Sequence, residues 1–189
     1  PELALAGQLF RVPHRPTLVG CQHGTVQHWG AYWRHFYFDH FLVFGETFRE
    51  RAPEALRGRV HATGLPKLDA IVPGSARRMG WDDRPSLFAA QTTRTDEVLR
   101  MLHALGTLSG RPVHVRPHPE FPELFADSGL PVASAGQPLL DQIASCSLVI
   151  TSGSTTVLES LVAGCPCVVL PLEQGEEYAA SGIVASTCA

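Results

Sequence analysis

Short apolar runs alternate with longer amphipathic segments along most of this chain of 189 residues. Several of the short runs are apolar at consecutive positions, which is typical of strands in a parallel sheet covered on both faces. Seven segments are therefore predicted to be strands: residues 17–21, 41–45, 58–64, 86–90, 112–117, 148–151 and 166–171.

Amphipathic helices are predicted at residues 95–108, 138–146 and 154–164. The first places Val98 and Leu102 on one face. The last is expected to be capped by Ser152 or Ser154 and to end at Gly164. Repeated alternation of strand and helix requires right-handed crossovers, so the predicted fold class is α/β, a Rossmann-like doubly wound parallel sheet.

The composition is that of an ordinary globular domain, with 44% apolar residues, 17% charged residues and a net charge of −3. A nucleic-acid binder normally carries a basic stripe, so this charge balance argues against one. No apolar run reaches the roughly 18–20 residues that span a bilayer, and no signal peptide is visible. We expect a cytoplasmic protein. This expectation includes peripheral association with the inner face of the membrane.

Five cysteines without regular spacing do not form a disulfide framework. We predict buried thiols in a reducing compartment. Cys165 and Cys167 flank a proline, but no second Cys/His pair lies at zinc spacing, and no metal site is predicted.

The first 40 residues differ from the rest, with histidines and aromatic residues crowded together. We predict that residues 1–40 are the incomplete end of a preceding N-terminal domain and that 41–189 form the α/β domain. Residues 28–41 contact either lipid, a partner or the core, and core packing is favoured. The chain starts at Pro1 and stops just after an apparent new strand, so we expect a piece of a longer protein, with its last domain truncated.

The most unusual segment is "TSGSTT" at residues 151–156, which leaves a strand and begins a helix with five hydroxyls. A helix N-terminus at the carboxyl end of a parallel strand is suited to phosphate. Gly153 lets the backbone approach a ligand, and phosphate oxygens would accept hydrogen bonds from the hydroxyls of Ser152, Ser154, Thr155 and Thr156.

Glu159 lies one turn further along the same helix, where its carboxylate can accept hydrogen bonds from ribose hydroxyls. The segment therefore indicates a nucleotide diphosphate site. In the alternative interpretation, one serine caps the helix and Glu159 complements the helix dipole. The sequence contains no Walker A motif, no Gly-x-Gly-x-x-Gly and no Gly-x-Ser-x-Gly, which excludes the common NTPase, dehydrogenase and hydrolase signatures.

Four further strand ends carry polar side chains. His118 lies between two prolines that stiffen its loop, and it can donate to a phosphate. Arg94 follows a strand and can neutralise a diphosphate, and Lys67 follows a Gly-Leu-Pro turn. His23 precedes a glycine at a strand end and is a candidate general base. Each of them can instead be a structural or solvated side chain.

The ordered set "QHGT", "VFGE", "TGLPKLD", "LFAAQTTR", "VRPHPE" and "LVITSGSTTVLESLVAGCPCVVL" resembles the C-terminal half of GT-B glycosyltransferases. It is most similar to the branch of CDP-glycerol glycerophosphotransferases and of capsule and surface-polysaccharide transferases. The resemblance covers roughly residues 17–185. It implies a donor-binding domain over 41–189 and an acceptor-side domain, mostly missing, before it.

This resemblance implies a role for each matching residue. His23 would be the catalytic base, and His118 would contact the donor phosphate. Ser154 and Thr155 would bind the diphosphate, and Glu159 the ribose. Lys67 and Arg94 match basic donor-side positions less closely.

The implied function is transfer of a sugar or polyol phosphate from a CDP-, CMP- or UDP-linked donor to a surface-polysaccharide or lipid-linked acceptor. No Asp-x-Asp pair is present, so we expect a metal-independent reaction with no cofactor. One departure is that the glycerophosphotransferase pattern Thr-Asp-Tyr-Ser-Ser reads Thr-Ser-Gly-Ser-Thr here, which leaves the donor open.

Three other readings remain. One is an enzyme like UDP-N-acetylglucosamine 2-epimerase, which would need carboxylates around the sugar. The second is a non-catalytic nucleotide-sugar-binding domain. The third is an α/β domain whose strand-end loops bind nothing.

Overall fold

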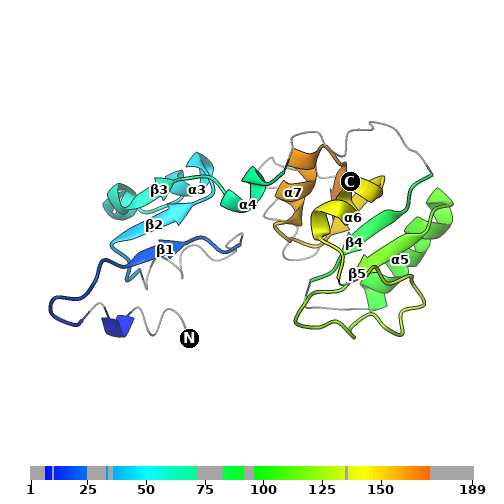
Figure 1. Cartoon of the computed structure of the whole chain (residues 1–189), viewed down its shortest axis with the longest axis horizontal. Coiled ribbons are helices and arrows are strands. Elements are labelled where there is room, and N and C mark those ends of the chain that lie inside the picture. The colour runs from blue at the N-terminus through cyan, green and yellow to red at the C-terminus, as the bar shows by residue number, and fades with distance from the viewer. Residues whose placement is uncertain are drawn as a thin grey trace. The chain divides into compact units, whose positions relative to one another are not determined.

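The computed structural model describes residues 7–9, 11–24, 33, 36–71, 83–91, 96–134 and 136–170. It divides into two compact units, Pro1–Lys67 and Leu68–Ala189, each with its own parallel sheet (Figure 1). All seven predicted strands are present, every strand pair in both sheets is parallel, and the α/β class is confirmed.

The N-terminal unit contains a three-stranded sheet in the order β1-β2-β3. Its strands are β1 (Val19–Cys21), β2 (His40–Val43) and β3 (Val60–Ala62). Val19 pairs with His40 and Phe41 pairs with Val60, so residues on both sides of position 40 share one sheet. The units therefore divide after Lys67 and not at the boundary expected between residues 40 and 41.

Aromatic side chains form the core of this unit. Trp33 and Phe41 are buried, and Phe36 and Phe38 pack against them with ring centroids 5.5 to 6.1 Å apart. The prediction of core packing for the aromatic stretch is confirmed for these residues. Three short helices that the periodicity did not predict follow the strands: α3 (Glu46–Glu50), a 3₁₀ helix (Glu54–Arg59) and α4 (Pro66–Asp69).

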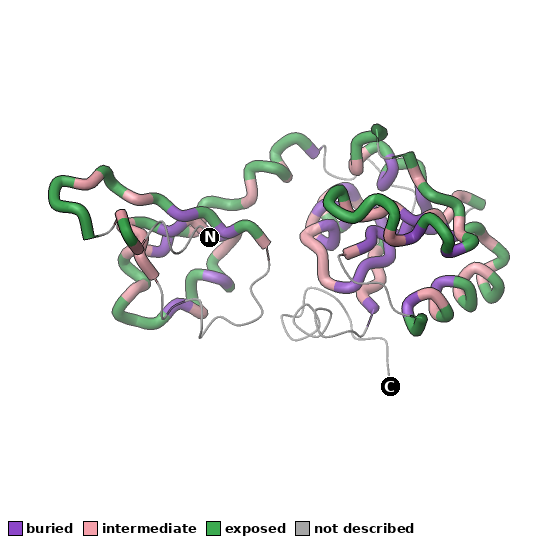
Figure 2. Tube along the Cα trace, turned by 90° about the horizontal axis from the view of Figure 1, so that it is seen from below, coloured by how far each residue is buried: buried purple, intermediate pink, exposed green. Residues whose placement is uncertain are grey.

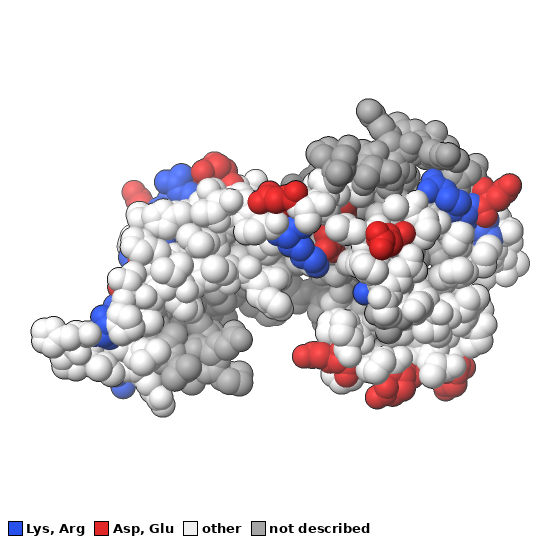
Figure 3. Space-filling model, in the orientation of Figure 1, with Lys and Arg blue, Asp and Glu red and all other residues white. Residues whose placement is uncertain are grey.

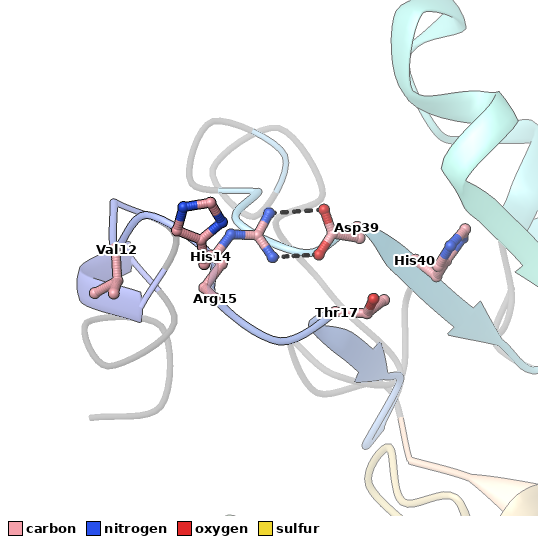
Figure 4. A pocket seen from close by; sticks show the side chains of 6 residues that line it. All are labelled: Val12, His14, Arg15, Thr17, Asp39 and His40. Carbon is pink, nitrogen blue, oxygen red and sulfur yellow. Dashed lines mark hydrogen bonds and ion pairs between the residues drawn. The ribbon is translucent and has the colours of Figure 1, made fainter.

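An ion pair ties the segment before β1 to the start of β2. The Arg15 guanidinium donates to both carboxylate oxygens of Asp39, and the backbone N–H of Leu18 donates to Asp39 Oδ2 at 2.8 Å. The pair crosses a pocket of about 580 Å³ at the amino ends of β1 and β2 (Figure 4). The residues that line it are Val12, His14, Arg15, Thr17, Asp39 and His40.

The C-terminal unit contains a four-stranded sheet in the order β5-β4-β6-β7. Its strands are β4 (Ser86–Ala89), β5 (Val113–Arg116), β6 (Leu148–Thr151) and β7 (Cys167–Val169). Every residue of β4 and β6 is buried, as expected of central strands covered on both faces. Figure 2 shows buried segments alternating with exposed ones along the trace.

Helices cover both faces of this sheet: α5 (Asp96–Ser109) on one, and α6 (Leu139–Ser145) and α7 (Thr156–Ala163) on the other (Figure 1). Val98 and Leu102 of α5 pack with Phe88 of β4, which confirms the predicted apolar face. Ile143 of α6 and Ala163 of α7 belong to a second cluster on the opposite side.

Glycines bound α7 at both ends. Gly153 lies in the turn before the helix and has a φ of +126°, a backbone angle that residues other than glycine rarely adopt. Gly164 has a φ of +79° and ends the helix in the left-handed conformation, as predicted. The residue types at the two turns thus fix where β6 stops and where α7 stops.

Asp39→Asn should destabilise the N-terminal unit at neutral pH, because a neutral amide cannot accept from Arg15 through two oxygens. The Arg15 hydrogen bonds and the Leu18 N–H hold the pKa of Asp39 well below its usual value of about 3.9. The contribution of Asp39 is therefore complete above about pH 4 and is lost as the pH falls through the lowered pKa.

Urea unfolding at several pH values measures this difference between the wild type and Asp39→Asn. Glu46→Gln is the matched control, since Glu46 pairs with Arg49 on an exposed helix and such pairs contribute about 0–1 kcal/mol. A difference for Asp39→Asn that stays constant as the pH is lowered would contradict the assignment.

Gly153→Ala should destabilise the C-terminal unit by about 1–3 kcal/mol, because alanine is strained at this φ. Gly106→Ala serves as control inside α5, where an added Cβ would lie 3.4 Å from the Arg111 carbonyl oxygen in ordinary contact. Alanine in a helix interior gains roughly 0.5–1 kcal/mol over glycine, so the two variants should shift the unfolding midpoint in opposite directions. Equal shifts would show that the turn at Gly153 is not constrained.

Candidate functional site

The connections of the C-terminal sheet diverge between β4 and β6. β4 leads through α5 to β5 on one side, whereas β6 leads through α7 to β7 on the other. Ligands of open α/β sheets bind at such a switch point, outside the carboxyl ends of the strands. The loop after Arg116 and the turn after Thr151 lie at the carboxyl ends of strands that flank β4, and the candidate site is built from them.

Hydroxyls in the turn after β6 partly hold the turn together. Thr151 Oγ1 donates to the Ala89 carbonyl at 3.2 Å and accepts from the Ser154 N–H at 3.4 Å. Ser154 Oγ accepts from the Thr156 N–H at 3.3 Å and lies 2.9 Å from Thr156 Oγ1. The N-cap of α7 is Thr155 and not Ser152 or Ser154, although Ser154, one residue before it, accepts the first N–H of the helix. Folding uses more of these hydroxyls than the sequence indicated.

Fewer residues of the turn are accessible to solvent than the sequence indicated. Ser152 and Thr156 are buried, while Gly153, Ser154 and Thr155 are half-buried. Thr155 makes no capping hydrogen bond. Its hydroxyl, its N–H and the N–H of Gly153 have no hydrogen-bond partner among the described residues. Three donors therefore lie at the accessible tip of the turn, beside the positive end of α7.

Glu159 lies one turn into α7, as expected, and its N–H bonds to the Thr155 carbonyl at 3.4 Å. Its side chain is only 1% exposed, so its carboxylate is buried. A ribose could contact it only if the side chain were uncovered. The ribose contact remains a prediction.

His118 follows β5, the strand on the other side of β4. Its Nδ1 accepts the Glu120 N–H at 3.3 Å, so in the neutral ring the hydrogen lies on Nε2. The ring packs against Phe121 with centroids 6.2 Å apart, and the side chain is 30% exposed. The stiff loop between Pro117 and Pro119 therefore presents an oriented N–H donor.

The structure does not test the two basic candidates, Arg94 and Lys67, as part of this site. Arg94 lies outside the described residues, which resume at Asp96. Lys67 is exposed in α4 and ends the N-terminal unit. His23 also belongs to the N-terminal unit. Within the described part of the C-terminal unit, the candidates at the ends of β5 and β6 lie at the same end of one sheet.

Gln22, which the sequence analysis did not single out, fixes the loop that carries His23. Its Nε2 donates to the Gly24 carbonyl at 3.0 Å, and its Oε1 accepts the Phe44 N–H at 3.0 Å. The side chain is buried, whereas His23 is exposed at the carboxyl end of β1. The only signal in the sequence was an amide residue directly before the His-Gly pair.

The cysteines are partly as predicted. Cys146 and Cys165 are buried, with sulfurs 3.8 Å apart, and this contact together with burial raises the pKa of Cys146. Burial raises the pKa of Cys167 to about 12. Cys21 is exposed, which the prediction of buried thiols missed. The described residues contain no group of three or more side chains suited to a metal ion.

Charged side chains of both signs are scattered over the face shown in Figure 3. Among the helices that the structure describes, none combines the length and the hydropathy that crossing a bilayer requires.

No protein-family model matches the chain, and the search of curated proteins found no match. A solved structure of the wall teichoic acid polymerase TagF is similar at a TM-score of 0.54 with 15% sequence identity. The match covers 88% of this chain and 52% of the polymerase, so the chain spans about half of its length. A histidine-to-asparagine variant of TagF soaked with CDPG gives a TM-score of 0.48 at 16% identity, covering 85% and 43% of the two chains. The first likeness establishes the fold: parallel sheets with flanking helices in a Rossmann-like α/β arrangement.

Proposed function

We propose that this chain contains the donor half of a metal-independent transferase. The reaction moves a sugar or polyol-phosphate group from a nucleotide-activated donor to a hydroxyl of a surface-polysaccharide or lipid-linked acceptor. The observation that carries the proposal is the tip of the β6–α7 turn, where three donors of Gly153 and Thr155 meet the N-terminus of α7 at the switch point. That chemistry suits the phosphates of a nucleotide.

The second phosphate contact in this proposal is His118. Strands lie about 4.8 Å apart, so the ends of β5 and β6, with β4 between them, are roughly 10 Å apart. A nucleotide diphosphate laid over the end of β4 would meet Thr155 on one side and His118 Nε2 on the other. Both groups would stabilise the negative charge on the departing nucleotide.

The remaining roles rest on the motif resemblance alone. Arg94 and Lys67 would add positive charge near the donor, and Glu159 would contact the ribose once uncovered. His23 would take the proton from the acceptor hydroxyl, an effect worth about 10²–10⁴-fold in rate. Gln22 would hold its loop for that task.

The similarity to TagF agrees with a polymer acceptor and an activated polyol donor, and the proposal includes both. Acceptor contacts would come largely from chain beyond this one, since the match covers 52% of the polymerase. We propose a CDP-, CMP- or UDP-linked donor and a cytoplasmic enzyme at the inner face of the membrane, in surface-polymer synthesis such as that of teichoic acid or capsule. An epimerase-like enzyme or a non-catalytic binding domain would share the donor site. Release of nucleotide by the full-length protein only in the presence of an acceptor would separate transfer from both.

Thr155→Val should weaken nucleotide binding, because it removes a hydroxyl that makes no capping hydrogen bond and leaves Ser154 in place. Calorimetry with CMP, CDP, UMP, UDP and GDP should find selective binding of one of them by the wild type. The variant should bind it roughly 10-fold more weakly, the equivalent of one hydrogen bond to a charged group. Thr107→Val on α5 is the matched control, and its affinity should be unchanged. If the folded wild type binds none of the nucleotides, the donor-site proposal fails.

His118→Ala should weaken binding of the same nucleotide by roughly 10- to 100-fold, since it removes a donor to a charged phosphate. His103→Ala on α5 is the control for the loss of an imidazole, because His103 bonds to the Ser128 carbonyl away from the strand ends. A diphosphate should lose more affinity than a monophosphate if His118 reaches the distal phosphate. Unchanged affinity would remove His118 from the site.

A further inference from the structure

Two histidines meet on the exposed face of the N-terminal sheet. Phe41 and Val60 belong to the aromatic core, so the residues that alternate with them along β2 and β3 point to the other face. His40, at the start of β2, and His61, in the middle of β3, lie on that other face, and both are exposed. Leu42 pairs with His61, which places His40 diagonally across from His61 on the neighbouring strand.

The two rings contact each other through one nitrogen each. His40 Nδ1 lies 3.0 Å from His61 Nε2, and the ring centroids are 5.1 Å apart. In the neutral pair, one of these nitrogens carries a hydrogen and the other a lone pair, so the contact is an N–H···N hydrogen bond. If that hydrogen moves to the far nitrogen of its own ring, the other tautomer forms and both facing nitrogens present a lone pair.

The spacing of these nitrogens is that of adjacent ligands on one metal ion. With metal–nitrogen distances of about 2.0–2.1 Å, a separation of 3.0 Å corresponds to an N–metal–N angle of roughly 91–97°. Tetrahedral coordination would place the nitrogens roughly 3.3–3.4 Å apart. Right angles are typical of Ni²⁺ and Cu²⁺, for which imidazole is a suitable ligand, whereas Zn²⁺ in proteins is almost always tetrahedral.

The surroundings of the pair are compatible with an added positive charge. Arg15, which lines a pocket together with His40, is neutralised by Asp39. In Figure 4 the ring of His40 points away from this ion pair. The guanidinium of Arg59 stacks over the Phe36 ring, 4.9 Å from its centroid, beside the aromatic core. Among the described residues, no third His, Cys, Asp or Glu joins the two histidines, so water fills the other coordination positions of a bound ion.

We propose that His40 and His61 form a surface site for a divalent transition-metal ion of the Ni²⁺ and Cu²⁺ class, bound through His40 Nδ1 and His61 Nε2. The ion links β2 to β3 on the face opposite the aromatic core. It takes no part in the proposed transfer reaction, so the metal site is independent of the proposed function.

The direct test is calorimetric titration of the wild-type chain, without an affinity tag, with Ni²⁺ and with Zn²⁺. Ni²⁺ should bind more tightly than Zn²⁺ and should raise the melting temperature, because the folded state alone holds the two nitrogens together. His40→Asn and His61→Asn should each weaken Ni²⁺ binding by at least the roughly 10- to 100-fold that loss of an outer-shell partner costs. Both side chains are exposed, so the variants should keep the urea midpoint of the wild type.

His103→Asn is the matched control, because the His103 ring bonds to the Ser128 carbonyl in the C-terminal unit. Its affinity for Ni²⁺ should equal that of the wild type. Unchanged Ni²⁺ affinity in either His40→Asn or His61→Asn, or tighter binding of Zn²⁺ than of Ni²⁺, would overturn the proposal.

Electron paramagnetic resonance with one equivalent of Cu²⁺ gives a second readout that counts the ligands. The nitrogen couplings should report two imidazoles bound to Cu²⁺ in the wild type and one in His40→Asn and in His61→Asn. A single bound imidazole in the wild type would show that the two histidines do not share an ion, and the proposal would fail.

Discussion

The placement of β4 between β5 and β6 is the constraint on which the C-terminal unit depends. Backbone hydrogen bonds join β4 to a strand that follows it and to one that comes 62 residues after it, from Ala89 to Thr151. This arrangement sends the following helices to opposite faces and creates the switch point. It also makes the side chain of Thr151 a link between two strand ends, so the turn after β6 is held to β4 before any ligand is considered.

The regular elements of the fold could be predicted because their signal is local. All seven strands, the three longer helices and the stop at Gly164 follow from apolar periodicity and from glycine chemistry. The division into units could not be found this way. Val19 pairs with His40, although the composition of residues 1–40 differs from that of the rest of the chain. Pairing between strands so far apart in sequence cannot be detected from a short window of residues. The short helices α3 and α4 were missed because they are too brief to show a period.

The candidate site shows the same limit at the level of side chains. The sequence identified the turn at 151–156, but it treated the hydroxyls as equivalent. The structure separates them, since Thr151, Ser154 and Thr156 hold the turn and Thr155 lies at its tip. Glu159 has the predicted position in the helix, but its side chain is buried. Which atom a hydroxyl or a carboxylate contacts depends on neighbours brought in by tertiary structure, such as the Ala89 carbonyl.

The outer edge of β5 illustrates how the sheet ends. Val115 donates its N–H to the Pro131 carbonyl at 2.7 Å and accepts the Ala133 N–H at 2.7 Å, and Val132 forms a single bridge beside it. A proline has no N–H to offer a further strand, and one bridge is too short to serve as a template. The segment therefore seals this edge against pairing with another molecule. An uncovered edge of β5 could pair with another molecule and lead to aggregation. The first effect of a substitution at Pro131 would therefore be a loss of solubility.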